Sequence, residues 1–452
     1  MAVVLEPRRV AVELAGRVES ESSFLEPLLA DRLGRLSAAR DEDRGLLTEL
    51  VYGTIRHRNR LDWIIDHTYR GDPSSMEPGL RNILRVAFYQ LSCMDRVPTY
   101  AAVNEAVKQA KESFPGREGL VNAILRNFLR KKNGVSFPEF RTDPVGHLTW
   151  YHSHPPWIVE RWIDRFGAEE ARELCVANNM PPPLVLRVNR LKASPGDAVE
   201  ALSRQGLRAA EARWSPDGLV LERGERGGLP ARRIKFVEEG FLQVQDEASQ
   251  LVSHLLDPRP GERLLDICSG AGIKATHLAA LMGNRGAVVA VDRNRRKLEL
   301  GRIRAEAMGV SIIEHIHADA LEIPLDEFRE GFDRILVDAP CSGLGTIRRR
   351  PEIKWLAGED KVAELALLQG ELLRHSAGML KPGGAMLYAT CTTTVEENEL
   401  VVREFLKKNP SFRIGEPPFI GDELIDEEGF FRTFPHRHGT DGFFAALLVK
   451  VS

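Results

Sequence analysis

The C-terminal half of the chain alternates short apolar runs with helical stretches, and this pattern constrains the fold most. Five runs of β-strand character lie at 263–268, 287–292, 313–319, 334–340 and 385–391. Amphipathic stretches such as 294–308 and 360–379 separate them. Apolar strands that alternate with helices are typical of a parallel sheet covered on both faces. We therefore predict an α/β doubly wound, Rossmann-like domain over residues 241–452.

The N-terminal part has apolar residues at helical spacing and no convincing strand. One apolar stripe runs from Ile83 to Leu91 and another from Leu120 to Leu129, which predicts amphipathic helices. We predict an all-α domain over residues 1–140, ending in a linker at 131–140. A small α+β segment should follow over residues 141–240, with a helix in "PPWIVERWIDRFG" and a strand in "PLVLRVNR".

Length and composition agree with several domains and no membrane span. At 452 residues the chain has room for two to four domains of roughly 150 residues each. It lacks an uninterrupted apolar run of the kind that spans a bilayer, and its N-terminus lacks the order of a signal peptide. We expect a cytoplasmic protein, a monomer, with no membrane partner.

Cysteine spacing and charge exclude some classes of protein. The five cysteines, an odd number without a C-x-x-C pair, lie at 93, 175, 268, 341 and 391. This disfavours a disulfide framework and a zinc site, so we predict free thiols and no metal. The net charge of -3 does not exclude nucleic acid, because binding depends on local clusters. Two basic clusters, 126–132 and 347–354, are interpreted first as solvated surface.

The first strand of the sheet runs into a glycine-containing loop, "DICSGAGIK". Gly270 and Gly272 allow close approach of a ligand before a helix that should begin near Lys274. Asp292 ends the next strand, 22 residues after Gly270 (292 − 270), close to the offset of about 20 residues for a carboxylate that binds a ribose diol. A tight turn without a ligand is the alternative for the loop alone.

The remaining features favour S-adenosylmethionine as the nucleoside-containing ligand. Asp319 ends the third strand, where it could accept a hydrogen bond from an adenine amino group or instead cap a helix. The chain has no G-x-x-x-x-G-K-[ST] motif, and its glycine loop lacks the third glycine of G-x-G-x-x-G. Kinase and dehydrogenase patterns therefore fit less well.

Strands four and five each end in a cysteine, Cys341 in "DAPCSG" and Cys391 in "YATCTTT". Adjacent strands lie about 5 Å apart, so both thiols could face one pocket. Such a pair suits methylation of pyrimidine carbon 5, which becomes nucleophilic after a thiolate adds to carbon 6. One thiol would attack and the other would assist release, and the residues alone do not say which. Asp338 could hydrogen-bond N3 and the amino group of a cytosine.

Thiolate attack requires a lowered thiol pKa, since a free cysteine is mostly protonated at neutral pH. Lys274, a helix start and the sulfonium of the cofactor are the available positive charges. The segment "TVEE", 394–397, has capping-box spacing and predicts that helix start.

With "DAPCSG", "YATCT" and "RRRPEIKW", the C-terminal part resembles the RNA cytosine-C5 methyltransferases. The segments "LLTELVYGTIRHRNRLDWII" and "VNAILRNFLRKK" resemble the NusB-like RNA-binding domain of bacterial small-subunit ribosomal RNA methyltransferases of the RsmB type. The resemblance covers essentially the whole chain. It implies methyl transfer from S-adenosylmethionine to a cytosine of 16S ribosomal RNA.

The resemblance also implies roles for individual residues. Cys391 would be the nucleophile, and Cys341 would promote product release. Residues that would bind or border S-adenosylmethionine are Cys268, Ser269, Gly270, Ala271, Gly272, Ile273, Lys274, Asp292, Asp319 and Asp338. The basic segment 126–132 would contact phosphates, and the target base would be single-stranded or flipped.

The chain departs from the family in its cofactor loop, which usually reads C-A-A-P-G-G-K-T. Ala271 replaces the proline, and Ile273 replaces a glycine. A β-branched residue disfavours positive φ, so either the loop backbone differs or that glycine never needed the conformation. Alternative functions are a transfer RNA or DNA cytosine methyltransferase, and a NusB-like RNA-binding or assembly factor with weak catalysis.

Overall fold

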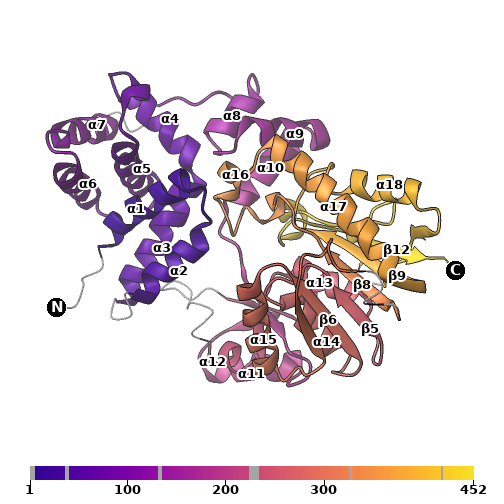
Figure 1. Cartoon of the computed structure of the whole chain (residues 1–452). Helices are drawn as coiled ribbons and strands as arrows, with labels where there is room; N and C mark the ends of the chain where they lie inside the picture. The colour runs from indigo at the N-terminus through magenta and orange to yellow at the C-terminus, as the bar shows by residue number, and fades with distance from the viewer. Residues whose placement is uncertain are drawn as a thin grey trace. The chain divides into compact units, whose positions relative to one another are not determined.

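The computed structural model describes residues 6–35, 40–130, 135–222, 234–324, 328, 330–418 and 421–451 (Figure 1). The chain packs as two units. The helical unit comprises residues 1–181 and 347–356, and the sheet unit comprises residues 182–346 and 357–452. The segment 141–240, predicted as one piece, is therefore divided between them. No helix of the described residues is long and apolar enough to cross a membrane.

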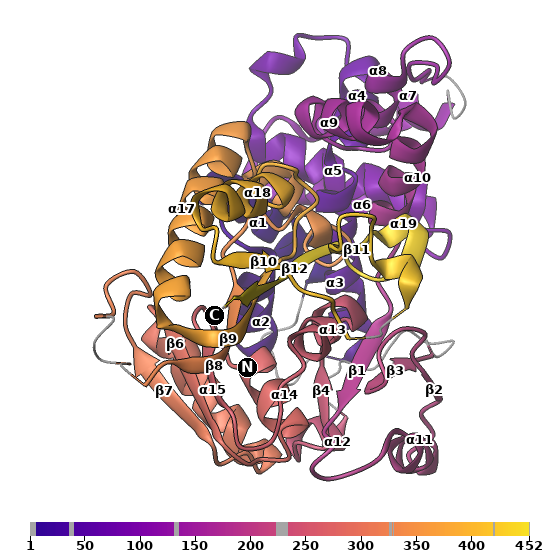
Figure 2. The same ribbon diagram turned by 90° about the vertical axis from the view of Figure 1, so that its right-hand side faces the viewer.

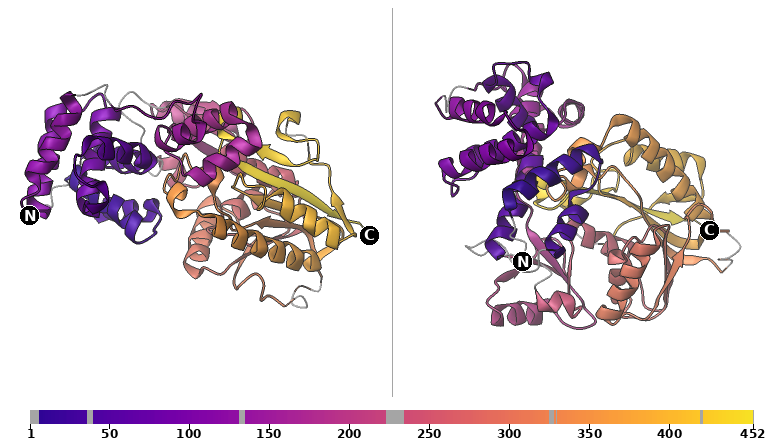
Figure 3. Two further views of the ribbon diagram at one scale, coloured as in Figure 1. Left: turned by 90° about the horizontal axis from the view of Figure 1, so that it is seen from above. Right: turned by 60° about the vertical axis from the view of Figure 1, so that its left-hand side comes forward.

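The helical unit is all-α over its described residues, as predicted; its part up to residue 181 runs from indigo to magenta in Figure 3, and α16 is orange. Its α-helices are α1 (Pro7–Ser20), α2 (Leu25–Arg35), α3 (Asp41–Arg56), α4 (Arg58–Thr68), α5 (Pro78–Cys93), α6 (Thr99–Ser113), α7 (Glu118–Arg130), α8 (Pro144–Trp150), α9 (Pro156–Phe166), α10 (Ala168–Asn179) and α16 (Ile353–Leu356). Helix α5 is buried on nearly every side and is the centre of the apolar core. The predicted helix in "PPWIVERWIDRFG" is α9.

The basic segment 347–354 is only partly exposed, because Arg348 and Lys354 are buried whereas Arg350 is exposed. Its interpretation as solvated surface is therefore wrong for Arg348 and Lys354. Lys354 is fully buried. Its Nζ donates to the carbonyl oxygen of Arg56 at 3.1 Å, that of Ser153 at 2.9 Å and Oδ1 of Asn179 at 2.8 Å. Three acceptors suit the three N–H groups of an ammonium, although burial lowers the pKa of Lys354 well below its usual range. The segment is thus an anchor within the helical unit.

The sheet unit begins with a small antiparallel sheet of strand order β2-β3-β1-β4. Its strands are β1 (Leu184–Val188), β2 (Ala209–Glu211), β3 (Gly218–Leu221) and β4 (Leu242–Val244), with helices α11 (Pro195–Arg204) and α12 (Lys235–Glu238). The predicted strand in "PLVLRVNR" is β1. Its buried residues form an apolar core with those of α11 and β3.

The main sheet has eight strands, in the order β10-β12-β9-β8-β5-β6-β7 with β11 paired to β12 (Figure 2). The strands are β5 (Arg263–Asp266), β6 (Ala287–Asp292), β7 (Ile313–His317), β8 (Phe332–Asp338), β9 (Leu380–Thr390), β10 (Phe412–Ile414), β11 (Phe431–Thr433) and β12 (Phe443–Lys450). Strands β5 to β9 pair in parallel, as predicted, whereas β12 returns antiparallel beside β9. Sequence analysis did not anticipate that return strand.

Helices cover both faces of the main sheet, as predicted for a doubly wound fold. They are α13 (Glu247–Leu256), α14 (Ile273–Leu281), α15 (Arg295–Met308), α17 (Glu359–Met379), α18 (Glu399–Lys408) and α19 (Pro435–His438). Residues of α17 and α18 share one core cluster with the strands, and residues of α13, α14 and α15 share another. The carboxyl ends of the parallel strands remain the place where a ligand can enter.

Replacement of Lys354 tests the anchor. Lys354→Met keeps the length of the side chain but leaves three buried oxygen atoms without a donor, which should lower the free energy of unfolding by about 3 kcal/mol. Urea unfolding of the full chain measures this, with the exposed Lys111→Met as control. Equal midpoints for both variants would contradict the anchoring role.

Candidate functional site

The two cysteines at the strand ends lie against one another. Parallel pairing of β8 and β9 sets Asp338 opposite Ala389, so the loops that follow leave the same edge of the sheet. Sγ of Cys341 and Sγ of Cys391 are 3.3 Å apart, and the backbone N–H of Cys391 also donates to Sγ of Cys341 at 3.3 Å. Both residues are partly exposed, and all five cysteines are free.

A close backbone contact locks the two cysteine loops together. The N–H of Gly345 donates to the carbonyl of Cys391 at 3.0 Å, and its own carbonyl accepts from the N–H of Gly442 at 2.8 Å. A Cβ on Gly345 would lie 1.9 Å from the carbonyl oxygen of Gly442. Only glycine fits here, which explains the glycine that follows the "PCSG" loop by two residues.

Lys274 brings a positive charge to this pair of thiols. Its Nζ donates to Oδ2 of Asp338 at 2.7 Å. Burial opposes the charge on Lys274, but attraction to Asp338 and to a thiolate at Cys391 outweighs it and raises the pKa of Lys274. Lys274 therefore stays an ammonium, and its charge would favour a thiolate at Cys391.

Cys341 is held as a thiol. The hydrogen bond to Cys391 and burial raise the pKa of Cys341 well above its usual range. The lowered pKa is expected for the attacking thiol, and Cys341 is not that thiol in the roles that the resemblance implies. Since two adjacent thiolates would repel each other, a negative charge on Cys391 would keep the proton on Cys341.

The backbone of the glycine loop explains how this chain has Ile273 where the family usually has a glycine. Positive φ falls on Gly270 (56°) and Gly272 (70°), whereas Ile273 is the first residue of α14 and is not among the positive-φ residues. A Cβ on Gly272 would also lie 3.2 Å from Cα of Gly301. The loop therefore forms without a glycine at 273. The carbonyl of Ala271 accepts from Arg304.

The acidic residues at the ends of the next two strands differ in their hydrogen-bond partners. Asp292 accepts from the N–H of Gly270 at 2.8 Å and from that of Asn294 at 2.7 Å, so it is joined to the glycine loop. Asp319 accepts from the N–H of Leu321 at 3.0 Å and shapes a turn; it caps no helix. Both carboxylates retain lone pairs for a further donor.

Asp266, the last residue of β5, is a further candidate that no sequence motif singled out. Asp266 is fully buried and neither of its oxygens has a hydrogen-bond partner, and the hydroxyl of Ser269 is also buried and unpaired. Burial and the charge of Asp338 raise the pKa of Asp266 to about 8. Burial likewise raises the pKa of Cys268. An acidic residue inside the apolar run "RLLDIC" was the available signal.

These residues fit S-adenosylmethionine. The free N–H groups at the start of α14 suit its carboxylate, and the unpaired oxygens of Asp266 suit a cationic amine. Asp292, beside the loop, suits a ribose diol. When bound, this cofactor supplies an electrophilic methyl group.

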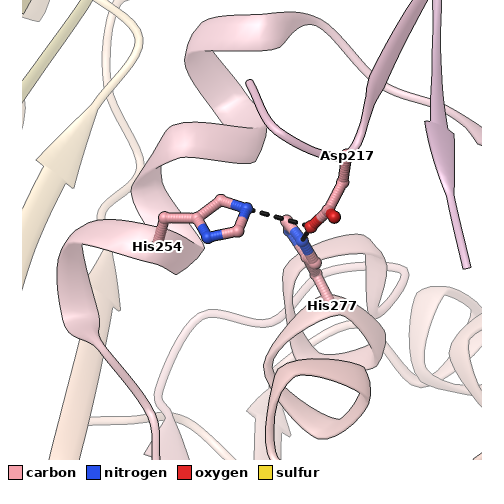
Figure 4. A group of neighbouring side chains, drawn as sticks. All are labelled: Asp217, His254 and His277. Carbon is pink, nitrogen blue, oxygen red and sulfur yellow. Dashed lines mark hydrogen bonds and ion pairs between the residues drawn. The ribbon is translucent and has the colours of Figure 1, made fainter. Parts of the chain in front are cut away.

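A second polar cluster lies away from the cysteines, where Asp217 accepts from two histidines (Figure 4). Nε2 of His254 and Nε2 of His277 both lie 3.0 Å from Oδ2 of Asp217, and these three residues could in principle hold a metal ion. However, Asp217 also pairs with Arg190 at 3.5 Å and attracts the fully buried Arg187. A metal ion would add positive charge beside two guanidinium groups, so we interpret the cluster as a hydrogen-bonded hub.

Comparison with known proteins places the whole chain in one family. It is 35% identical over 451 residues to the Probable ribosomal RNA small subunit methyltransferase B of Bacillus subtilis, covering 98% of each chain. It is 34% identical over 461 residues to the Ribosomal RNA small subunit methyltransferase B of Pseudomonas syringae, covering 99% of this chain and 98% of that protein. The chain belongs to the ribosomal RNA small subunit methyltransferase B family.

Family models agree with this assignment part by part. Residues 253–449 match the model described as 16S rRNA methyltransferase RsmB/F, residues 5–130 match the NusB family, and residues 154–226 match the RsmF/B-like ferredoxin-like domain. The predicted NusB-like and methyltransferase folds are confirmed, and the α+β segment is ferredoxin-like. The protein is an S-adenosylmethionine-dependent RNA methyltransferase.

Solved structures show the same fold. The structure titled "Crystal Structure of PH0851" is 29% identical, covers 100% of both chains and has a TM-score of 0.81. A methyltransferase homolog protein from Pyrococcus horikoshii is also 29% identical, covers 68% of this chain and 99% of that one, and has a TM-score of 0.58.

Removal of Cys391 should make Cys341 easier to ionise. Cys391→Ala takes away the hydrogen bond and the neighbouring charge that raise the pKa of Cys341. Alkylation of Cys341 by iodoacetamide should therefore reach its midpoint at a lower pH than in the wild-type protein. Mass spectrometry of the Cys341 peptide measures the midpoint, with the exposed Cys93 as internal control. An unchanged midpoint would contradict the coupling.

Proposed function

We propose that this protein methylates carbon 5 of a cytosine in 16S ribosomal RNA through a covalent adduct with Cys391. The observation that carries the proposal is the pair of thiols 3.3 Å apart, with the Lys274–Asp338 ion pair beside them. The names of the relatives support ribosomal RNA as substrate class. Carbon 5 is the target because it needs a thiol for activation, whereas amino or hydroxyl groups do not.

The first step is addition of the Cys391 thiolate to carbon 6. A carbon–sulfur bond forms, and the electrons of the 5,6 double bond move into the ring, so that carbon 5 becomes nucleophilic. Lys274 favours the attacking thiolate by its charge. Asp338, the carboxylate partner of Lys274, is the group proposed to hydrogen-bond the cytosine N3 and amino edge as charge builds on the ring.

Release follows once carbon 5 carries the methyl group. Water takes the proton from carbon 5, the electrons of that carbon–hydrogen bond restore the 5,6 double bond, and the carbon–sulfur bond breaks to return a thiolate at Cys391. Cys341 keeps its proton and lies within 3.3 Å of that sulfur, so it can hydrogen-bond the departing thiolate. This favours Cys341 as the residue that promotes release.

The helical unit would supply RNA affinity through phosphate contacts. Arg126 is exposed on α7, and its Nε donates to Oδ1 of Asn122 at 2.9 Å. Lys131 and Lys132, the rest of the predicted basic surface, lie outside the described residues. The non-catalytic alternative rested on the altered loop, and Ile273 fits that loop as the start of α14.

Transfer of a labelled methyl group tests the proposal. Wild-type protein should label carbon 5 of cytosine in unmodified 16S RNA, with transfer RNA and DNA as comparison substrates. Cys391→Ala should give neither product nor adduct, because no thiolate can add to carbon 6. Cys341→Ala should accumulate the protein–RNA adduct, because release slows.

Two results would contradict the proposal. Product formation by Cys391→Ala would exclude Cys391 as nucleophile. If the wild-type protein binds 16S RNA and S-adenosylmethionine but methylates only transfer RNA, its substrate is transfer RNA and not 16S RNA.

A further inference from the structure

Glu397 lies at the centre of a buried hydrogen-bond network beside the two cysteines. Its side chain is fully buried. Oε1 accepts from the backbone N–H of Ser342 at 2.7 Å and from Nε2 of Gln369 at 3.1 Å. Oε2 accepts from the hydroxyl of Ser342 at 2.6 Å and from that of Thr394 at 2.8 Å. Four donors converge on its two oxygens, which is the pattern of a carboxylate acceptor.

The four donors come from three separate parts of the sheet unit. Ser342 belongs to the loop after β8, Gln369 to helix α17, and Thr394 to the loop after β9. Gln369 is itself buried and also donates to the carbonyl of Pro340 at 2.9 Å. A single carboxylate therefore joins both cysteine loops to a helix behind them.

The network reaches the residue next to each cysteine. Ser342 follows Cys341 directly and Thr392 follows Cys391 directly. Their hydroxyl oxygens are 2.7 Å apart. Since the hydroxyl of Ser342 donates its one hydrogen to Glu397, the hydroxyl of Thr392 must donate to Ser342. Both cysteines are thus one peptide away from groups that Glu397 orders.

Helix capping does not account for Glu397. The spacing of "TVEE" predicts that Glu397 is the carboxylate of a capping box, and this prediction is wrong. Helix α18 begins at Glu399, after Asn398. Glu397 accepts from Thr394 within the loop, and its remaining bonds cross to other segments.

We propose that Glu397 is a positioning residue: its carboxylate clamps the loops 340–345 and 391–397 so that the two thiols stay at contact distance. A displacement of one ångström of a reacting group can cost about 100-fold in rate. A buried carboxylate with four donors holds its partners more tightly than an exposed loop contact would. This inference deepens the proposed function and rests on it for the catalytic meaning of the thiols.

Oxidation of the two thiols tests the clamp without RNA. Diamide joins two neighbouring thiols into a disulfide and takes up both hydrogens, and the sulfur atoms must approach to about 2.05 Å. The wild-type protein should form the Cys341–Cys391 disulfide readily. Glu397→Ala should form it at least about tenfold more slowly, because the effective concentration of one thiol near the other falls. Peptide mass spectrometry measures the disulfide.

Matched variants separate positioning from general destabilisation. Glu399 is also buried, and it pairs with Arg432 at 2.6 Å, so Glu399→Gln should oxidise like wild type. Glu397→Gln keeps one acceptor oxygen and should restore part of the rate. If Glu397→Ala does not fold, Ser342→Ala removes a single hydroxyl of the network and should slow oxidation to a smaller extent.

Methyl transfer supplies the second readout. Glu397→Ala should lower the rate of methyl transfer by about 100-fold while S-adenosylmethionine binding, measured by calorimetry, stays at the wild-type value. Wild-type rates of both disulfide formation and methyl transfer in Glu397→Ala would overturn the proposal. Equal decreases in the rates of disulfide formation and methyl transfer in Glu399→Gln would also overturn it. If the wild-type protein does not methylate RNA but still forms the disulfide faster than Glu397→Ala does, the result would contradict the proposed function and support the clamp.

Discussion

The parallel pairing of β8 with β9 is the interaction on which the rest of the site depends. Because parallel strands end at one edge of a sheet, the register of Asp338 with Ala389 brings the loops of Cys341 and Cys391 into contact. Antiparallel pairing would separate their carboxyl ends by the length of a strand. The ion pair of Lys274 with Asp338 and the glycine contact between the loops only refine a position that this register has already set.

Much of this arrangement is readable in the sequence, because local patterns determine it. The run 287–292 is apolar up to its final residue, Asp292, and forms β6 with the same bounds. Cys341 and Cys391 each follow such a run, so the rule that parallel strands share an edge was enough to predict their proximity. Gly270 and Gly272 marked the ligand loop because glycine allows a ligand to approach the backbone closely, and both residues have positive φ.

The parts that the sequence did not reveal depend on partners distant in the chain. Segment 347–354 carries four basic residues, yet Lys354 is buried because three oxygens from the helical unit surround it. Glu397 matched a capping box by spacing, but three of its four hydrogen bonds come from Ser342 and Gln369, which are distant in the chain. Asp266 lies in an otherwise apolar strand, and it belongs to no motif that would mark it as functional. The spacing of residues in the sequence predicts contacts within one helix or strand. It cannot predict a hydrogen-bond partner that another helix, strand or loop supplies.

The most direct measurement uses 16S RNA that contains 5-fluorocytidine, whose fluorine cannot leave carbon 5 as a proton does. With S-adenosylmethionine present, the account predicts a stable methylated protein–RNA adduct, and peptide mapping should locate the nucleotide on Cys391, with Cys341 unmodified. An adduct on Cys341, or methylated RNA without any trapped adduct, would contradict the account.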